Sequence, residues 1–521
     1  MGGALKAERL RWQEPAAVGV ATVVLGIALL PALFAAGKLV FAARGTFDLL
    51  ASSRLWWLLI RSLRLSVGVT VLALAAGIPL GVLFARAKLP FKRLLFALHF
   101  GIVFLPPLLP SLGWFHLFGR EGLFGGITSA RLLFSEFGVV MVLVGCFTPV
   151  VTVLTALGVS GIDSSLEDAA RLVARPWRTV LGVLVPCAMP AISLSGIVVF
   201  VLAFSELGAP MFLRVSVYPT VVFARLGGLD FAPGEATVFV LPLVVVAMGL
   251  LWIERRVAGR RAVAVLGASP RSRAMLFDVR PWSIIVVGLA AACSCLPIAS
   301  LLLNSRDGGG LSAVARWASE APLNSLRSGG CAALVMLALA LVLGHAVARR
   351  SPVGLWLDAI TTLAFILPSS ILGVGVALAW NRPWTNWFYG SYGILVLGFV
   401  ARYSAVATRV FASTIAQVPL SFEDAARSVG ASYARRLMLL VGQLRRGCVG
   451  TFAIAFVFCL RDLETAALFY PPGGEPLTVR IFTLEANGPP AIVSGMAGLQ
   501  VVMTFAVVGI SWLFLRPRQS Q

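Results

Sequence analysis

Glu167-Asp-Ala-Ala-Arg-Leu-Val-Ala174 and Glu423-Asp-Ala-Ala-Arg-Ser-Val-Gly430 are two copies of one motif, 256 residues apart and identical at six of eight positions. Five consecutive identities indicate an internal duplication. Other elements recur near the same offset: Arg61-Ser-Leu63 and Asn324-Ser-Leu326 each open an apolar run, and these runs close at Arg86 and Arg349. The sequence therefore predicts two related halves, residues 1–265 and 266–521, each with one copy of the motif.

The rest of the chain is strongly apolar. Of 521 residues, 59% are hydrophobic and 12% are charged, and the mean hydropathy is +0.92. Apolar runs of about 18 to 25 residues are long enough to cross about 30 Å of hydrocarbon as helices. Lipid offers no partner for backbone amides, and the alternating pattern of an outer-membrane barrel is not evident, so helices are the expected spans. The predicted class is an all-α polytopic membrane protein.

About twelve spans are expected, six in each half, and an even number returns each half to its starting side. The two halves are then parallel repeats, and both motifs face the same side. The expected spans are residues 16–40, 62–85, 94–117, 137–158, 181–204, 236–253, 282–303, 327–348, 358–380, 392–412, 447–469 and 493–515.

The formal charge of +21 comes from basic residues that cluster on alternate connections between the spans. This is the positive-inside pattern, so it predicts that the clusters, the motifs and both chain ends are cytoplasmic. Binding to nucleic acid is not expected, because basic residues and aromatic residues do not alternate in any soluble segment. The clusters contain Arg86, Lys88, Lys92 and Arg93; Arg255, Arg256, Arg260, Arg261, Arg271 and Arg273; and Arg435, Arg436, Arg445 and Arg446.

Each motif is expected to begin a short helix outside the membrane. Ser164 stands three residues before Glu167, and Ser421 three before Asp424, which is the spacing of a helix cap. The paired alanines that follow give a helix with little side-chain bulk, which suits close insertion into a groove of a partner protein.

In this pattern the chain resembles the permeases of ATP-binding-cassette (ABC) importers, whose signature is Glu-Ala-Ala, three residues and glycine. The resemblance implies a type I importer fold in which this segment is a coupling helix, here near 159–180 and 414–446. It also implies two ABC ATPase subunits in the cytoplasm, an external solute-binding protein and a bacterial inner-membrane location. The residues that it assigns to ATPase docking are Glu167, Asp168, Ala169, Ala170, Arg171 and Ala174, with Glu423, Asp424, Ala425, Ala426, Arg427 and Gly430.

The two copies depart from that signature in different ways. The first has Ala174 where the family has glycine but keeps Pro186 and Pro190, which lie at the positions of the family's proline. The second keeps Gly430 but has Gly442 and Arg446 at those positions. Two non-identical docking sites are therefore expected.

The second half also contains a stretch that is similar to fused iron(III) permeases, Leu460-Arg-Asp-Leu-Glu-Thr-Ala-Ala-Leu-Phe-Tyr-Pro-Pro-Gly-Gly474. Ser205-Glu-Leu-Gly-Ala-Pro210 resembles the matching site of the first half. Fused thiamine permeases share this layout. Iron(III) is thus the first expected substrate, and thiamine or another small solute is the alternative.

Four charged residues stand at the expected outer ends of spans five and eleven: Glu206, Arg461, Asp462 and Glu464. Buried charges are costly unless they are paired or face water. Two interpretations stay open: the residues line an outer gate that meets the substrate, or they form structural ion pairs such as Arg461 with Glu464. Arg402 and Arg409 are expected either to pair with carboxylates or to extend to an interface.

Other functional classes find less support. The three histidines and seven cysteines do not form a ligand set, so neither a stable metal site nor a cofactor is expected. No Gly-x-x-x-x-Gly-Lys-[Ser/Thr] loop is present, so ATP hydrolysis is assigned to a separate subunit and the chain is not expected to be an enzyme. A major-facilitator carrier would share the layout of twelve spans, but its loop signature is missing from Arg86-Ala-Lys-Leu-Pro-Phe-Lys-Arg93.

Overall fold

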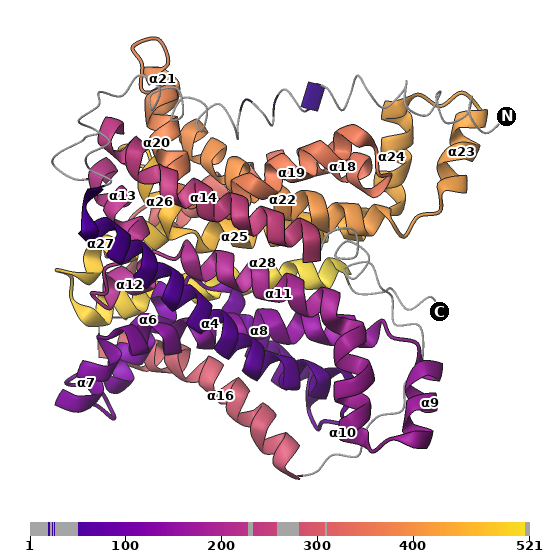
Figure 1. Ribbon diagram of the computed structural model, residues 1–521. Helices are drawn as coiled ribbons and strands as arrows, with labels where there is room; N and C mark the ends of the chain where they lie inside the picture. Colours follow the sequence, from indigo (N-terminus) through magenta and orange to yellow (C-terminus); the bar gives the residue numbers. More distant parts are fainter. Residues whose placement is uncertain are drawn as a thin grey trace.

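The computed structural model describes residues 19, 20, 23, 26, 51–227, 233–257, 281–307 and 310–515. These residues fold into helices, most of which run roughly parallel to one another (Figure 1). Seven of the helices are long and apolar enough to cross a membrane, and counting each bent pair as one span gives up to ten. The predicted all-α polytopic fold is confirmed. The total of about twelve stays a prediction, because the expected first span, 16–40, lies almost wholly outside the described residues.

In the first half, three packed helices form the core: α4 (Ser53–Arg86), α8 (Glu136–Ser160) and α11 (Val185–Phe204). The elements around them are α5 (Lys92–Gly101), η2 (Ile102–Phe104), α6 (Leu108–Phe118), α7 (Ile127–Leu133), α9 (Ser164–Val173), α10 (Pro176–Thr179), η3 (Val180–Leu184), α12 (Gly208–Phe212), α13 (Tyr218–Gly227) and α14 (Pro233–Val257).

The second half repeats this arrangement with α18 (Ala321–Ala348), α22 (Tyr392–Ile415) and α25 (Arg445–Arg461) as its core. Its other elements are α16 (Pro281–Asn304), η4 (Ser305–Asp307), α17 (Gly310–Ala318), α19 (Pro352–Ile366), α20 (Ser369–Trp380), α21 (Asn386–Tyr389), α23 (Leu420–Ser428), α24 (Tyr433–Gln443), α26 (Leu463–Phe469), α27 (Leu477–Glu485) and α28 (Pro490–Leu515). The boundary between residues 265 and 266 lies outside the described residues and stays a prediction.

Small residues allow the first two core helices of each half to pack closely. A Cβ atom at Gly77 would lie 2.6 Å from the Cβ of Val151, and one at Gly81 would meet α8 equally closely. Ala340 and Gly344 occupy the corresponding places on α18, where Gly344 packs against the backbone of α22. Pairs of small residues four apart are typical of helices that pack in membranes, where close backbone contact replaces the hydrophobic effect.

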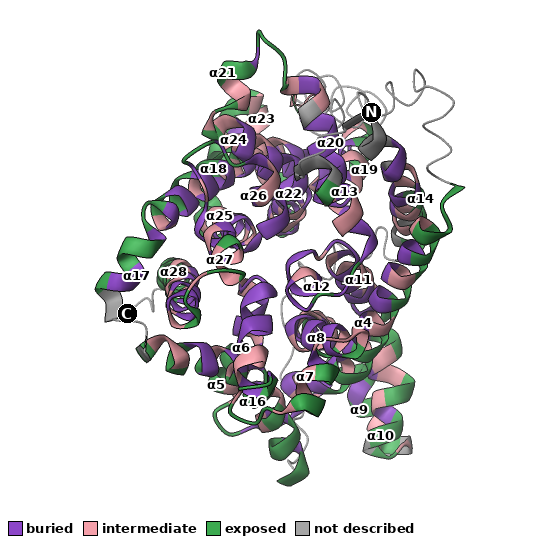
Figure 2. Cartoon of the chain, turned by 90° about the vertical axis from the view of Figure 1, so that its left-hand side faces the viewer, coloured by how far each residue is buried: buried purple, intermediate pink, exposed green. Residues whose placement is uncertain are grey.

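The halves interlock through exchanged helices (Figure 1). α16, the first described helix of the second half, packs against α5 and α6 of the first, whereas α14 of the first half packs against α19 and α20 of the second. Val20, one of the few described residues before 51, contacts the cluster of Leu343 and Leu357 in the second half. Buried residues gather where the halves meet, and the outer surfaces of α16 and α21 are exposed (Figure 2).

Three of the expected spans are broken rather than continuous, so those predictions are wrong in this detail. Residues 94–117 form α5 and η2 and then, after a bend of 108°, α6. Pro106 and Pro107 lie at this break and Pro368 at the break within 358–380, because proline has no N–H to continue a helix. Residues 447–469 break at Asp462, whose backbone is extended and which begins α26.

The motif helices α9 and α23 lie at the same end of the bundle, on the right in Figure 1. We call this end the motif face, and the end that carries α7, α21 and α27 the opposite face. Exposed tryptophans mark both ends, as expected for side chains at a membrane interface. Among them are Trp56, Trp57, Trp384 and Trp387 towards the opposite face, and Trp252, Trp282, Trp356 and Trp512 towards the motif face.

Candidate functional site

The glutamate of the first motif points into the protein and not into solvent. Glu167 is 1% exposed, and its carboxylate lies 2.9 Å from Nε of Arg86, at the end of α4, and 2.7 Å from Nη2 of Arg171. Nη2 of Arg86 also donates to the carbonyl oxygen of Val159 at 2.9 Å. One arginine therefore joins the motif helix, the end of α8 and the end of α4.

The second motif is held in a similar way. Glu423 is 5% exposed, and its carboxylate accepts a hydrogen bond from Nε of Arg349 at 2.7 Å and lies 2.8 Å from Nε2 of His345. Arg349 also donates to the carbonyl oxygen of Val418 at 3.1 Å. Burial alone would raise the pKa of Glu423, but the hydrogen bond and charge of His345 and the Arg349 guanidinium lower it to about 2.

Sequence reasoning did not pair these arginines with the motif glutamates. The signal was present, because Arg86 and Arg349 close equivalent apolar runs near the offset that separates the two motifs. His345 provides the second contact to the glutamate of the second motif, as Arg171 does in the first half.

Each motif helix begins and ends in its own manner. Asp163 caps α9 by accepting a hydrogen bond from the N–H of Ser165 at 3.0 Å, so the N-cap position is one residue before the expected Ser164. Helix α23 begins at Leu420 and has no side-chain cap, so the expected cap by Ser421 is wrong. Gly430 follows α23 with φ of +78°, a conformation that favours glycine. Ala174 follows α9 with an extended backbone (φ −135°), which alanine adopts freely. The departure from glycine in the first copy thus has a backbone reason.

With the glutamates turned inwards, the outer surface of both motif helices consists mainly of small and apolar side chains, with the charged Asp168 also exposed on α9. Leu172 is 87% exposed on α9, and Val429 is 83% exposed just after α23. Of the other expected docking residues, Asp168, Ala169, Ala425 and Gly430 are exposed, and Ala170, Arg171, Ala174, Asp424, Ala426 and Arg427 are partly exposed.

The connections from the motifs back into the bundle also differ. In the first half, residues Trp177–Phe204 run as one apolar helix that contains a wide turn, η3, just before Pro186. A wide turn absorbs the missing N–H of a proline without ending the helix. In the second half, α24 and α25 meet at a bend of 85° beside Gly442. The two copies are therefore not identical in geometry.

A small cavity lies between the halves, at the level where the helices break. Its lining includes Pro106 and Pro107 from the first break, the segment 205–208 between α11 and α12, and the segment 461–464 between α25 and α26. Only about 30 Å³ is open to the centres of water molecules, which is room for very few waters. All four charged residues that were expected at the outer span ends line this cavity.

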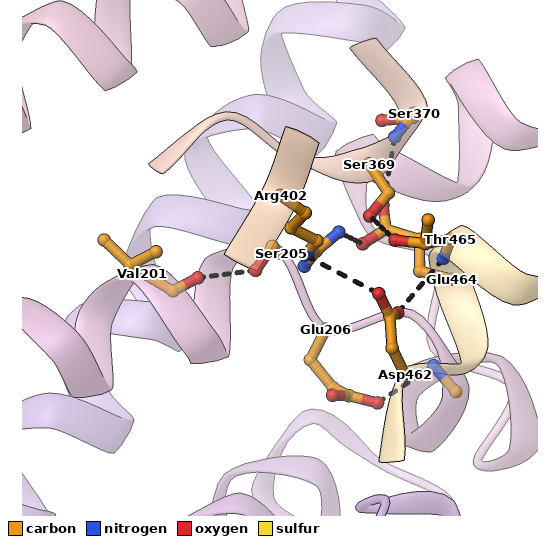
Figure 3. A network of polar contacts seen from close by, with 10 residues as sticks. Val201, Ser205, Glu206, Ser369, Ser370, Arg402, Asp462, Glu464 and Thr465 are labelled. Atoms are coloured by element: carbon orange, nitrogen blue, oxygen red, sulfur yellow. Dashed lines mark hydrogen bonds and ion pairs between the residues drawn. The ribbon is translucent and has the colours of Figure 1, made fainter. Parts of the chain in front are cut away.

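The carboxylates around the cavity accept hydrogen bonds from backbone N–H groups at the starts of helices. Oε1 of Glu206 accepts from the N–H of Gly208 at 3.1 Å at the start of α12, and Oδ1 of Asp462 accepts from the N–H of Thr465 at 3.0 Å at the start of α26. The two residues are 256 positions apart, so the duplication preserved an acidic cap at equivalent places. Glu464 accepts from the N–H of Ser370 at 3.3 Å, in the first turn of α20 (Figure 3).

Two buried arginines face these carboxylates. Nη1 of Arg402 lies 2.9 Å from Glu464 and its Nε lies 3.9 Å from Asp462 (Figure 3). Arg461 does not pair with Glu464, so that suggested ion pair is wrong; its Nη1 donates to the carbonyl oxygen of Val103 at 2.5 Å. Arg409 forms two hydrogen bonds with Asp358, at 2.9 and 3.0 Å, which confirms the carboxylate alternative for both Arg402 and Arg409.

Comparison with known proteins relates the chain to transport permeases, although no protein-family model matches it. The ferric transport system permease protein FbpB of Actinobacillus pleuropneumoniae is 21% identical over 440 residues, which cover 77% of this chain and 63% of that protein. The probable ABC transporter permease protein y4fN of Sinorhizobium fredii is 24% identical over 394 residues, 67% of each chain. The thiamine transport system permease protein ThiP of Brucella melitensis is 26% identical over 494 residues, 88% of this chain and 87% of that one.

The chain thus spans less than two thirds of the ferric relative and most of the thiamine relative. The match to the thiamine relative covers 88% of this chain, so it extends across both halves. The chain is therefore a homologue of the permease proteins of ABC transport systems.

Proposed function

We propose that this protein is the transmembrane permease of a binding-protein-dependent ABC importer in a bacterial inner membrane. The motif face lies in the cytoplasm and binds two ABC ATPase subunits, one at α9 and one at α23. A solute-binding protein delivers the cargo at the opposite face. ATP is hydrolysed by the ATPase subunits, and the chain itself is not an enzyme.

The observation that carries this proposal is the pair of buried glutamate–arginine contacts. Glu167 and Glu423 fasten the two motif helices to the ends of α4 and α18, the longest described helix of each half. A force applied to either motif helix therefore reaches a core helix directly. The exposed faces, with Leu172 and Val429 outermost, remain for contact with the ATPase.

We infer a small cation as cargo, because the cavity lining contains three carboxyl groups and two guanidiniums, so acidic groups outnumber basic ones. A path with this charge balance attracts cations and repels anions. Iron(III) is the first candidate, since FbpB of A. pleuropneumoniae is named as a ferric permease. Thiamine, also a cation, is the second candidate, because the thiamine relative matches nearly the full length of both chains.

Uptake into sealed vesicles tests this function. The permease is reconstituted with an ABC ATPase and the binding protein from its own gene neighbourhood, and radiolabelled iron(III) and thiamine are offered separately. We expect ATP-dependent accumulation of one of them, and its loss when the exposed Leu172 and Val429 are both changed to aspartate. Uptake that proceeds without ATP or without the ATPase would contradict the proposal.

A further inference from the structure

We propose that Arg461 is a latch that joins the two halves and keeps the path closed towards the opposite face. The proposal concerns the conformational cycle of the permease and rests on the proposed function. Arg461 is at the end of α25 in the second half, whereas its partner, the carbonyl oxygen of Val103, belongs to η2 in the first half. This bond therefore crosses the boundary between the halves, and it is a charge-assisted bond made out of contact with bulk water.

The bond from Arg461 to Val103 joins two helix breaks. Val103 lies directly before the break at Leu105–Pro107, and Arg461 directly before the break at Asp462. Helix breaks are the places where a segment can swing without disturbing the packing on either side. By bonding one break to the other, Arg461 holds two otherwise movable segments together.

The two halves also touch directly at the level of these breaks, which closes the path there. A Cβ atom on Gly208 would lie 2.8 Å from Cδ2 of Leu463, so the backbone of the first half touches a side chain of the second half there. The cavity beneath is too small for a solvated cation or for thiamine. The structure is thus closed at this level, and cargo can pass only after the halves separate and the bond from Arg461 to Val103 is broken.

Two other arginines inside the bundle, Arg402 and Arg409, have their described ion pairs within one half. Arg402 bonds to Glu464 and Arg409 to Asp358, and all four of these residues belong to the second half. Arg409 therefore offers a matched control: it is a substantially buried arginine whose described ion pair stays within one half.

Thiol labelling tests the latch without ATPase, binding protein or cargo, so its failure is distinguishable from failure of the proposed function. In a chain whose seven cysteines are replaced by serine, Leu202→Cys places one thiol in the cavity lining, on the motif side of the breaks. A charged, membrane-impermeant methanethiosulfonate is then added to vesicles from the opposite face.

We expect slow labelling in this parent and labelling faster by about tenfold or more in Arg461→Ala, since one charge-assisted hydrogen bond is lost. Arg461→Lys, which keeps the charge but has a single donor group, is expected to fall between them. Gly208→Ala, which forces Leu463 away, is expected to increase labelling with Arg461 intact. Arg409→Ala is expected to label like the parent.

Labelling of Arg461→Ala and Gly208→Ala at the parental rate would overturn the proposal. An equal increase in Arg409→Ala would overturn it as well, because loss of any buried arginine would then suffice. Gly208→Ala and Arg461→Lys are mild substitutions, so they keep the test decisive where Arg461→Ala fails to insert.

Discussion

The guanidinium of Arg86 and the carboxylate of Glu167 lie 2.9 Å apart, and their side chains are only 5% and 1% exposed. A buried pair of this kind contributes little net stability compared with two apolar residues, but losing one partner leaves an uncompensated charge. Arg349 and Glu423 repeat the relationship in the second half. The motif glutamates thus hold the motif helices in place, and the residues next to them form the outer surface of these helices.

Replacing Arg86 by alanine is expected to release α9 from α4. Glu167 would keep only the partly exposed Arg171 as its partner. Removing one partner of a buried ion pair costs about 3 to 5 kcal/mol, far more than an isolated short helix can supply. Limited proteolysis of the loop 159–180 and co-purification with the ATPase measure the release. The double change Arg86→Met with Glu167→Leu is expected to restore protection, because no charge is left buried.

Arg64→Ala is the control for this prediction. Arg64 pairs with Glu136 but is 68% exposed, and exposed pairs contribute about 1 kcal/mol or less. Unchanged protease protection of α9 in Arg86→Ala would show that the pair does not hold the motif helix.

Replacing Gly430 by alanine is expected to cost about 1 kcal/mol, because its φ of +78° is strained for any residue with a Cβ atom. No atom lies within 4 Å of the added Cβ, so the effect is purely conformational. Gly430→Asn is expected to cost less, since asparagine tolerates this region. ATPase binding affinity should follow the order Gly, Asn, Ala.

The opposite substitution, alanine to glycine in the first half, is the control for Gly430→Ala. Ala174→Gly introduces the family's glycine at an extended position, where it is not required, and is expected to change ATPase binding little. A gain in affinity equal to the loss in Gly430→Ala would contradict the backbone explanation.

Much of this organisation could be predicted from the sequence, because it depends on local and periodic signals. The duplicated motif, the apolar runs and the unequal Ala174 and Gly430 are all visible without coordinates. The breaks at Pro106 and Pro368 could not be predicted in the same way, because proline shows where a helix is weakened but not how the segment beyond it packs.

Contacts between distant parts of the chain could not be predicted in the same way. Arg461 was placed beside Glu464 by its spacing of three residues, yet it bonds to Val103, 358 residues away. Asp462 ends α25 and begins a new helix, so the regular spacing on which the local pair relied is interrupted there. Likewise, α14 packs against the second half and α16 against the first. The periodicity of the sequence does not predict such tertiary contacts.

The contacts of Glu423 with Arg349 and His345 are expected to persist at acidic pH. The pKa of Glu423 is lowered to about 2 from an ordinary value of 4.5, so its stabilising contribution is complete above about pH 4.5 and is lost as the pH falls through about 2. At about pH 3.5 the carboxylate is still ionised in the folded protein. Proteolysis of the loop 414–446 against pH should show release only below about pH 3.

Glu423→Gln is the matching control, because it cannot form the ion pair at any pH. We expect its loop to be cut equally at neutral pH and at pH 3.5. Release of the loop in the unmodified protein with a midpoint at the ordinary pKa of a glutamate would refute the strong pairing with Arg349 and His345.

Ser62 and Ser325 are expected to contribute equally to the stability of the protein. Each joins a short helix at the opposite face to a core helix. The Ser62 hydroxyl accepts from the N–H of Tyr218 at 2.7 Å, at the start of α13, and the Ser325 hydroxyl accepts from the N–H of Leu477 at 2.8 Å, at the start of α27. This gives a physical reason for the recurrence of Ser-Leu at the openings of the two runs.

Alanine at either position leaves a buried N–H without its acceptor, which costs roughly 1 to 3 kcal/mol. Thermal unfolding in detergent should show similar losses for Ser62→Ala and Ser325→Ala, and nearly additive losses when both are changed, since the two sites lie in different halves. Ser511→Ala serves as the control, because that hydroxyl donates only to the carbonyl of Val507 on its own helix, four residues earlier. Equal unfolding temperatures for the control and both single variants would mean that these serines recur for another reason.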